Sequence, residues 1–432
     1  EDLQGDTDLR DDQWHFIAAT YDGNTAKLYV DGELDDQISF STDYLSTLSG
    51  DNNTYIGRGN HDPEYFTGDL DEIAVWNIAL TVEQIQDNMY TALSGYEEDL
   101  VGYWNFNEGD GTTLTDLSGN GNNGAISGAT WSTNMPQPPY DGPEWYVSVE
   151  GFNDNNGSIY YPFATIQHAI DSANESDSIF VGPGTYVENI NFNGKNIKLT
   201  SSDGPNATII DGDQNGSVVN ISSGESYARL SGFTIKNGTA VEGAGIFFND
   251  ATADIDNLVL IDNVATQGGA LYLVNSNVSA QGLTINNNSS THDGGGVYVL
   301  NSEVNISSSV ISNNTSENNG GAFLQSGNLT VSSCEIAYNS ASDMGAAFAI
   351  INHDTTNIVN CTIAENSIGA VITLEEESGD EAPPVVILNS IIWGNTSNDL
   401  YTVGGSVPVT MLYTDHEDGM EGEGNFSADP LF

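Results

Sequence analysis

Hydrophobic and polar residues alternate in short segments over much of the chain, and the segments recur with a fixed period. Each repeat holds three alternating stretches separated by Gly, Asn and Ser, and a Gly-rich apolar element such as Gly268–Tyr272 returns every 24 to 26 residues. No stretch is long enough for a crossover helix. Three short strands per repeat, stacked so that each coil pairs with the next, predict a parallel β-helix.

A column of asparagines accompanies these repeats. Its members follow an apolar-x-x-Asn pattern and are Asn263, Asn288, Asn314, Asn339, Asn366 and Asn395. Asn tolerates positive φ at tight turns, and stacked amides can hydrogen-bond the coils above and below. We therefore predict an asparagine ladder along one corner of the β-helix.

Proline content marks a boundary between two regions. Residues 134–143 hold four of the twelve prolines, which is typical of a semi-rigid linker. The predicted organisation is a β-sandwich over 1–133, this linker, and a β-helix of about ten coils over 144–432. Residues 161–170 have the apolar spacing of a short amphipathic helix, which we expect to cap the open N-terminal end of the β-helix.

The repeats carry a family resemblance. The pairing of Gly-Gly-Ala-apolar with apolar-x-x-Asn resembles the repeat of polymorphic outer-membrane proteins, within the pectate-lyase-like right-handed β-helix superfamily. Residues 162–170 and 181–190 resemble the beginning of such modules, and residues 422–432 resemble their last coil. The resemblance implies a right-handed β-helix but no particular activity.

The first 95 residues resemble a concanavalin-A-like, laminin-G-type jelly roll. The matching stretches are 14–23, 27–32, 55–57 and 68–80. Strands that the family places before Asp12 are missing, whereas segments resembling a module's beginning, Leu100–Gly109 and Asn120–Gly124, come afterwards. The all-β fold class therefore combines the β-helix with a jelly roll that is either incomplete or permuted, and an incomplete sandwich would expose a strand edge.

One predicted parallel sheet includes the strands Thr234–Lys236 and Ile391–Trp393. Because side chains alternate between the two faces of a strand, the sequence predicts which residues of this sheet point outward. Its ionisable residues are Lys236 and Glu335, four coils or roughly 19 Å apart, so they cannot form a catalytic pair. We therefore predict no catalytic residue on this face. An interaction face is predicted instead from its apolar members, which are Val259, Ile261, Val310, Ile391 and Trp393.

Metal and redox chemistry are open questions in the sequence. The six histidines show no zinc-ligand spacing. Carboxylates in turns are suitable ligands for Ca²⁺, and the laminin-G resemblance implies calcium near a ligand site. The candidate calcium ligands are Asp22, Asp31, Asp69 and Asp71. The alternative is that these residues only form turns. Cys334 and Cys361 occupy the same position in successive repeats, so we expect them to lie in adjacent coils. They are either two small buried side chains or a disulfide.

Charge restricts the partners. The chain contains sixty-two acidic residues and seven Lys and Arg, which gives a net charge of −55. This charge argues against nucleic acid and anionic membranes as binding partners. No apolar run is long enough for a membrane span. The sequence has no initiator Met and no signal peptide, which suggests a processed or incomplete chain. The acidity suits an extracellular or cell-surface protein of a marine or salt-environment prokaryote.

The leading hypothesis is a non-enzymatic adhesion or structural protein, with the β-helix as a stalk and the jelly roll binding a glycan or surface protein. Self-association into filaments through open ends or edges is a variant, motivated by the missing strands and by Phe432 at the chain's end. The alternative is an extracellular polysaccharide lyase or glycoside hydrolase with a carbohydrate-binding module. Its carboxylates would come from loops such as the acidic segment Glu375–Pro384.

Overall fold

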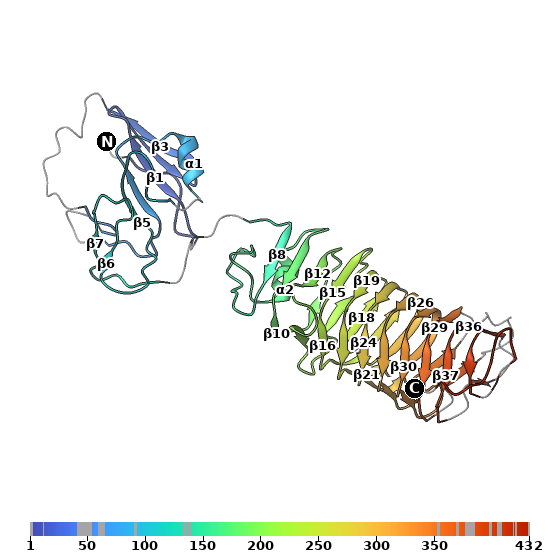
Figure 1. Ribbon diagram of the computed structural model, residues 1–432. Coiled ribbons are helices and arrows are strands. Elements are labelled where there is room, and N and C mark those ends of the chain that lie inside the picture. Colours follow the sequence, from blue (N-terminus) through green and yellow to red (C-terminus); the bar gives the residue numbers. More distant parts are fainter. Residues whose placement is uncertain are drawn as a thin grey trace. The chain divides into compact units, whose positions relative to one another are not determined.

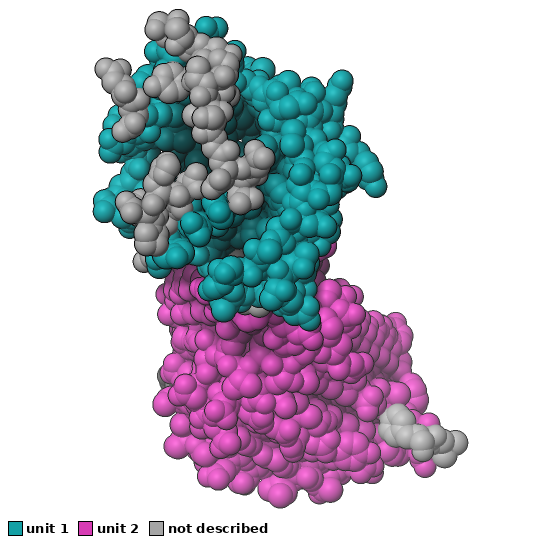
Figure 2. All heavy atoms as spheres, turned by 90° about the vertical axis from the view of Figure 1, so that its left-hand side faces the viewer, with its two compact units in different colours: residues 1–138 teal, residues 139–432 magenta. Residues whose placement is uncertain are grey.

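The computed structural model contains two compact units, residues 1–138 and 139–432 (Figures 1 and 2). The division falls within the proline-rich segment 134–143. The structure describes the following residues: 3–11, 13–40, 54–58, 65–89, 93–132, 136, 140–351, 355–368, 371–375, 385–396, 400–403, 408–417, 419 and 421–430.

The second unit is a parallel β-helix, as the repeats predict. Among the described residues, one face is a parallel sheet of ten strands: β10 (Gly184–Val187), β13 (Thr208–Asp211), β16 (Thr234–Lys236), β20 (Val259–Ile261), β24 (Thr284–Asn286), β27 (Val310–Ser312), β30 (Glu335–Ala337), β34 (Thr362–Ala364), β37 (Ile391–Trp393) and β40 (Asp415–His416). The regular solenoid has about eight turns, slightly fewer than the ten coils expected.

Two further faces come from an eighteen-stranded sheet that turns a corner. One face contains β8 (Glu144–Val147), β9 (Ser178–Val181), β12 (Lys198–Ser201), β15 (Ala228–Ser231), β19 (Thr252–Asp256), β23 (Asn277–Gln281), β33 (Thr356–Val359), β36 (Val385–Leu388) and β39 (Val409–Leu412). The other contains β11 (Ile190–Asn191), β14 (Val219–Ile221), β18 (Ile246–Asn249), β22 (Leu271–Val274), β32 (Phe348–Ile351), β35 (Ile372–Glu375) and β38 (Leu400–Val403). The long strands β26 (Val297–Ser307) and β29 (Phe323–Ser332) continue around the corner.

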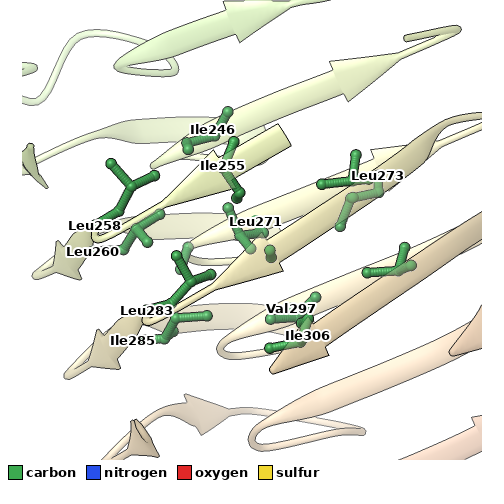
Figure 3. Packing of buried hydrophobic residues seen from close by; sticks show 14 of the residues in the cluster. Ile246, Ile255, Leu258, Leu260, Leu271, Leu273, Leu283, Ile285, Val297 and Ile306 are labelled. Atoms are coloured by element: carbon green, nitrogen blue, oxygen red, sulfur yellow. The ribbon is translucent and has the colours of Figure 1, made fainter. Parts of the chain in front are cut away.

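A fourth face, made by a short third sheet, follows the asparagine corner. It contains β17 (Thr239–Glu242), β21 (Val264–Gln267), β25 (Ser289–Asp293), β28 (Thr315–Ser316) and β31 (Ser340–Ala341). Inward side chains of all faces meet in one core, and equivalent positions of successive coils lie above one another, as Leu258 and Leu283 do in Figure 3. Phe323 and Phe348 are in register and stack with ring centroids 4.8 Å apart.

Buried asparagine amides join neighbouring coils. Asn288 Nδ2 donates to Asn314 Oδ1 at 3.0 Å, and Asn314 Nδ2 donates to Asn339 Oδ1 at 3.0 Å. Each amide oxygen also accepts the backbone N–H of the previous asparagine, and Asn314 Nδ2 donates to the Ile285 carbonyl. The same pattern links Asn263 to Asn288 and runs on through Asn366 to Asn395. Each amide thus satisfies backbone groups that the tight turn removes from the ladder.

Helix α2 (Ile166–Ser172) covers the N-terminal end of the β-helix. Its apolar face, Ile166, Ala169 and Ile170, is buried against β8, β9 and β11. The Glu188 carboxylate accepts the N–H groups of Ile166 and Gln167 at 2.8 and 3.0 Å, so it caps the helix N-terminus. Lys195 Nζ donates to three carbonyl oxygens at the other end of the helix. The predicted capping helix is confirmed.

At the opposite end of the β-helix, residues 421–428 fold back along the last strand of the ten-stranded sheet, β40, and the residues just before it. Phe426 forms a parallel bridge with Asp415, and the Asn425 side chain accepts the Thr414 N–H and donates to the Met411 carbonyl. These bonds occupy backbone groups of the last rung that end-to-end stacking would need. Phe432, on which the filament variant drew, lies outside the described residues.

The first unit contains small antiparallel sheets. They are β1 (Ile17–Tyr21), β2 (Thr25–Val30) and β3 (Glu33–Ser39) in one sheet, β4 (Ile73–Trp76) with β5 (Leu100–Trp104), and β6 (Thr113–Leu114) with β7 (Gly124–Ala125); α1 (Val82–Asn88) follows β4. The segment that resembles a module's beginning, β5, pairs with β4. This pairing favours the permuted alternative.

Candidate functional site

The candidate site is a groove on the outer surface of β15, β19 and β23, which we call the Arg229 groove. Its volume is about 500 Å³. Its lining residues are Arg229, Asp254, Ile255, Asp256, Asn257, Ser279, Gln281 and Gly282. Arg229, Asp254 and Ser279 occupy one register position on adjacent strands, and strict alternation turns all three side chains outward. Ile255 and its partners on the adjacent strands, Leu230 and Ala280, point into the core. The groove therefore presents charged, amide and hydroxyl side chains on a rigid sheet.

Asp256 is held in place by its neighbours on β15. Arg229 Nη2 lies 3.2 Å from Asp256 Oδ1, and the Ser231 hydroxyl donates to Asp256 Oδ2 at 2.7 Å. These two contacts hold both carboxylate oxygens of Asp256 in place. Asp256 is therefore positioned to accept hydrogen bonds from a ligand.

Asp254 lies two residues before Asp256 on the same face of β19. This spacing separates their Cα atoms by about 6.6 Å. Glycoside hydrolases act through two carboxyl groups on one surface, so a pair of this kind is a candidate for such chemistry. The sequence interpretation, which assigned no catalytic pair to the β-helix, considered only the ten-stranded face and missed this pair of carboxylates.

The local charge of the groove differs from that of the rest of the β-helix. Lys198 is in register with Arg229 on the adjacent strand, and both side chains are exposed. Residues 237–432 contain no Lys or Arg at all. The Lys and Arg residues of the second unit are thus confined to its first coils. Two of them, Lys198 and Arg229, lie at the groove, where they give a ligand positive partners beside the carboxylates.

A track of uncharged polar side chains continues from the groove along the rod. Ser279, Asn305 and Thr330 occupy one register position on successive strands, and Gln281, Ser307 and Ser332 occupy the position two residues later. Each strand adds one pair of hydrogen-bonding groups about 4.8 Å from the last. Such a surface suits an extended, hydroxyl-rich polymer.

The predicted interaction face lies on the ten-stranded sheet and is not continuous. Val259 and Ile261 (β20) face outward, separated from Val310 (β27) by the polar strand β24, while Ile391 and Trp393 lie three strands further, on β37. All are half-buried except Val310, which is exposed. The five residues therefore lie at three separate places on the sheet rather than in one strip.

The two ionisable residues of that face do not meet. Lys236 pairs with Asp211 at 3.2 Å, whereas Glu335 is exposed on β30. Of the predicted acidic loop, residues 376–384 lie outside the described part of the chain, and Glu375 ends β35.

The predicted calcium ligands do not form one cluster. The Asp22 carboxylate accepts the N–H groups of Asn24 and Thr25, which hold its pKa below the usual value, Thr25 contributing most. Asp31 accepts the Phe16 N–H and bonds His15 Nδ1 at 2.8 Å. Among the residues that the structure describes, no group of three or more His, Cys, Asp or Glu is arranged to hold a metal ion. Calcium binding stays a prediction.

Asp69 precedes a half-buried acidic pair, Asp71 and Glu72. Burial raises the pKa of both carboxyl groups. The Tyr103 hydroxyl donates a hydrogen bond to the Glu72 carboxylate. The pKa of the Tyr103 phenol is raised, mainly by burial and next by this hydrogen bond. Glu72 thus links the segment before β4 to β5, and the Asp71 carboxylate accepts the Glu72 N–H beside it.

The two cysteines lie in adjacent coils, and both are buried free thiols. Cys334 Sγ donates to the Ser332 carbonyl at 3.2 Å and Cys361 Sγ to the Val359 carbonyl at 3.3 Å. Ser309 and Ser390 make the same contact two residues back in the flanking coils. The thiols therefore take the place of serine hydroxyls in this column.

Comparisons with known proteins agree with the two folds. Residues 1–86 match the concanavalin A-like lectin/glucanases superfamily. Residues 244–411 match the right handed beta helix region. The chain combines a concanavalin A-like module with a right-handed β-helix. No curated protein matches it.

Solved structures similar to the chain are distant. A protein from Bacteroides ovatus described as carbohydrate binding is 24% identical, with a TM-score of 0.24; the match covers 30% of this chain and 41% of that one. Pectate lyase Pel9A is 18% identical over 63% of this chain and 68% of its own, with a TM-score of 0.34. Pectin methylesterase from Aspergillus niger is 13% identical over 67% and 91%, also with a TM-score of 0.34. None of the described helices is both long and apolar enough to cross a membrane.

Proposed function

We propose that this chain is an extracellular or cell-surface protein that binds a glycan along its β-helix and does not cleave it. The observation that carries the proposal is the Arg229 groove, where a guanidinium, two carboxylates, two amides and a hydroxyl converge on one rigid surface. Planar side chains of this kind form paired hydrogen bonds with neighbouring hydroxyl groups. The concanavalin A-like match of the first unit supports a carbohydrate ligand.

Binding without cleavage is supported by the contacts of Asp256. A hydrolase needs one carboxyl group that holds a proton for the leaving group. Both carboxylate oxygens of Asp256 are engaged by Arg229 and Ser231, so this group is not placed to protonate a leaving group. The β-helix then acts as a stalk that carries its binding surface along its length, in an adhesion or structural role.

Polysaccharide cleavage is the second candidate function, and the pair Asp254 and Asp256 favours it. The two carboxylates extend from one outward face of β19, paired carboxyl groups are what glycoside hydrolysis uses, and Arg229 supplies a cation beside Asp256. In this alternative Asp254 would serve as the general acid, because Asp256 is ion-paired.

Binding is tested by titrating neutral and acidic polysaccharides into the whole chain by calorimetry. Asp254→Asn and Gln281→Ala are expected to weaken binding about tenfold each, since each removes ligand hydrogen bonds. Thr284→Ala, on the ten-stranded face, is the matched control and should leave affinity unchanged. Equal affinity in all variants would exclude the groove as the binding site.

A further inference from the structure

The two cysteines of the chain, Cys334 and Cys361, occupy the same position in successive coils of the β-helix. The strands on either side of them, β29 with β33 and β30 with β34, are paired in parallel and in register. The two cysteines are therefore in register as well, and their Cα atoms are separated by about 4.8 Å, the spacing of neighbouring strands. This separation falls within the range of about 4.4–6.8 Å that a disulfide requires.

Both thiols lie in the core of the β-helix. Cys334 and Cys361 are only 3% and 2% exposed. Cys361 Sγ is 3.5 Å from the carbonyl oxygen of Val331, which belongs to the coil of Cys334, so the Cys361 side chain leans toward that coil. The two thiols are close enough to interact directly. The sulfur atoms are therefore neighbours in the reduced form of the protein.

Serine fills this position in the flanking coils, and it makes the same contact. The hydroxyl groups of Ser309 and Ser390 donate to the carbonyl group two residues back, as the two thiols do. A thiol is a weaker donor than a hydroxyl group, so this hydrogen bond does not call for sulfur. A chain with two cysteines in 432 residues nevertheless places both of them here, in successive coils. Sulfur offers what two hydroxyl groups do not, a covalent bond between the coils.

A bound metal ion is the other use of paired thiols in proteins. Structural zinc takes four ligands, mostly Cys and His, in a tetrahedron. In the part of the chain that the structure describes, no group of three or more His, Cys, Asp or Glu is placed to hold a metal ion. The pair is therefore better suited to bond to itself than to complete a zinc site.

We propose that Cys334 and Cys361 form a disulfide that joins two successive coils when the chain folds in an oxidising environment. Because the folded core shields both thiols, the bond forms before these coils close. One cysteine thiolate attacks a small disulfide such as oxidised glutathione, and the second thiolate then displaces the remaining glutathione. The cysteines are oxidised, and the glutathione disulfide is reduced to two thiols, which take up the two cysteine protons. Each coil contacts only its neighbours, so the bond opposes separation of the rod at this point.

The test folds the whole chain in a glutathione redox buffer and, separately, with excess reductant. When the oxidised sample is denatured without reductant, iodoacetamide should label neither cysteine, and peptide mapping should find the fragments with Cys334 and Cys361 linked. The denaturant midpoint of the β-helix transition should be higher in the oxidised sample than in the reduced one. The double variant Cys334→Ser, Cys361→Ser is the matched control, because serine occupies this position in the flanking coils. Its midpoint should be the same in both buffers.

Three results would overturn the proposal. The first is labelling of both cysteines in the chain that folded in the oxidising buffer. The second is a linked pair that leaves the midpoint unchanged, since the bond would then not hold the coils together. The third is a disulfide-linked dimer of the wild-type chain on a non-reducing gel, which would show pairing between chains. None of these measurements depends on glycan binding, so they test the disulfide separately from the proposed function.

Discussion

The β-helix and the first unit use their hydrophobic residues differently. The β-helix fully buries large side chains in every region of its length, among them Phe192, Phe248 and Phe348. In the described part of the first unit, the buried hydrophobic residues are Tyr29, Val30, Ile85, Leu100, Tyr103 and Leu114, whereas Ile17 and Leu34 are exposed on strands. A coil needs only its two neighbours to complete its core, whereas a sandwich needs strands from distant parts of the chain.

The largest difference between the units is expected from truncating a stacked core ring. Phe323→Ala removes the partner of Phe348 and leaves a cavity between two coils, so it should lower the free energy of unfolding of the β-helix by about 3–5 kcal/mol. Calorimetry should show that the transition of the first unit is unchanged. Phe152→Ala, an exposed ring of the β-helix unit, is the control; equal losses in both variants would contradict the packing account.

The asparagine ladder should be almost as sensitive. Asn314→Ala leaves the Asn288 N–H and the Ile285 carbonyl without their buried partner, at a cost of about 3 kcal/mol. Denaturant unfolding would measure the change. The exposed Asn305→Ala should cost less than about 0.5 kcal/mol; a similar loss from both would mean that the ladder hydrogen bonds are not a source of stability.

The β-helix could be predicted from the sequence because its information is repeated. Asn288 and Asn314 occupy the equivalent position in successive coils, so the same hydrogen bonding at a tight turn explains both of them. The Arg229 groove was missed although its signal was present: the alternation Ala253–Asp256 already places Asp254 and Asp256 on one outward face. The sequence analysis searched the ten-stranded face instead, because alternation alone does not tell which outward face is hollowed.

The first unit was less predictable for a related reason. The pairing of β4 with β5 joins strands that no periodicity connects, and Glu72 and Tyr103 meet only through it. The contacts of Asp31 with His15 likewise depend on tertiary structure. The sequence alone therefore could not distinguish a turn carboxylate from a metal ligand there.

The N-terminal cap gives a smaller, pH-dependent effect in the β-helix. Burial raises the pKa of Glu188 from its usual 4.5, although two N–H groups act against this. The folded state then holds the proton more tightly than the unfolded state, so the free energy of unfolding falls as pH rises from 4.5 through the raised pKa. Glu188→Gln should remove this part of the pH dependence, measured by denaturant unfolding across the window, while the exposed Glu335→Gln should not.

The smallest expected effect is in the first unit. Asp31 and then Asp11 raise the pKa of His15 above its usual 6.5. Protonated His15 therefore stabilises this unit below pH 6.5, and the contribution is lost as pH rises through the raised pKa. His15→Asn should remove a stabilisation of less than about 1 kcal/mol, since the ion pairs are partly exposed. Calorimetry at about pH 6 and about pH 8 would detect this loss of stability in the unfolding transition of the first unit only. A change in the unfolding transition of the β-helix would contradict the assignment.

Whether the Arg229 groove holds a polysaccharide intact is the central question. The direct measurement is a time course of new reducing ends and unsaturated ends after the chain is mixed with a polysaccharide that it binds, with and without calcium. The account predicts saturable binding, weakened by Asp254→Asn, and no new ends. New ends that form with the wild-type chain and disappear with Asp254→Asn would show instead that the groove is an active site.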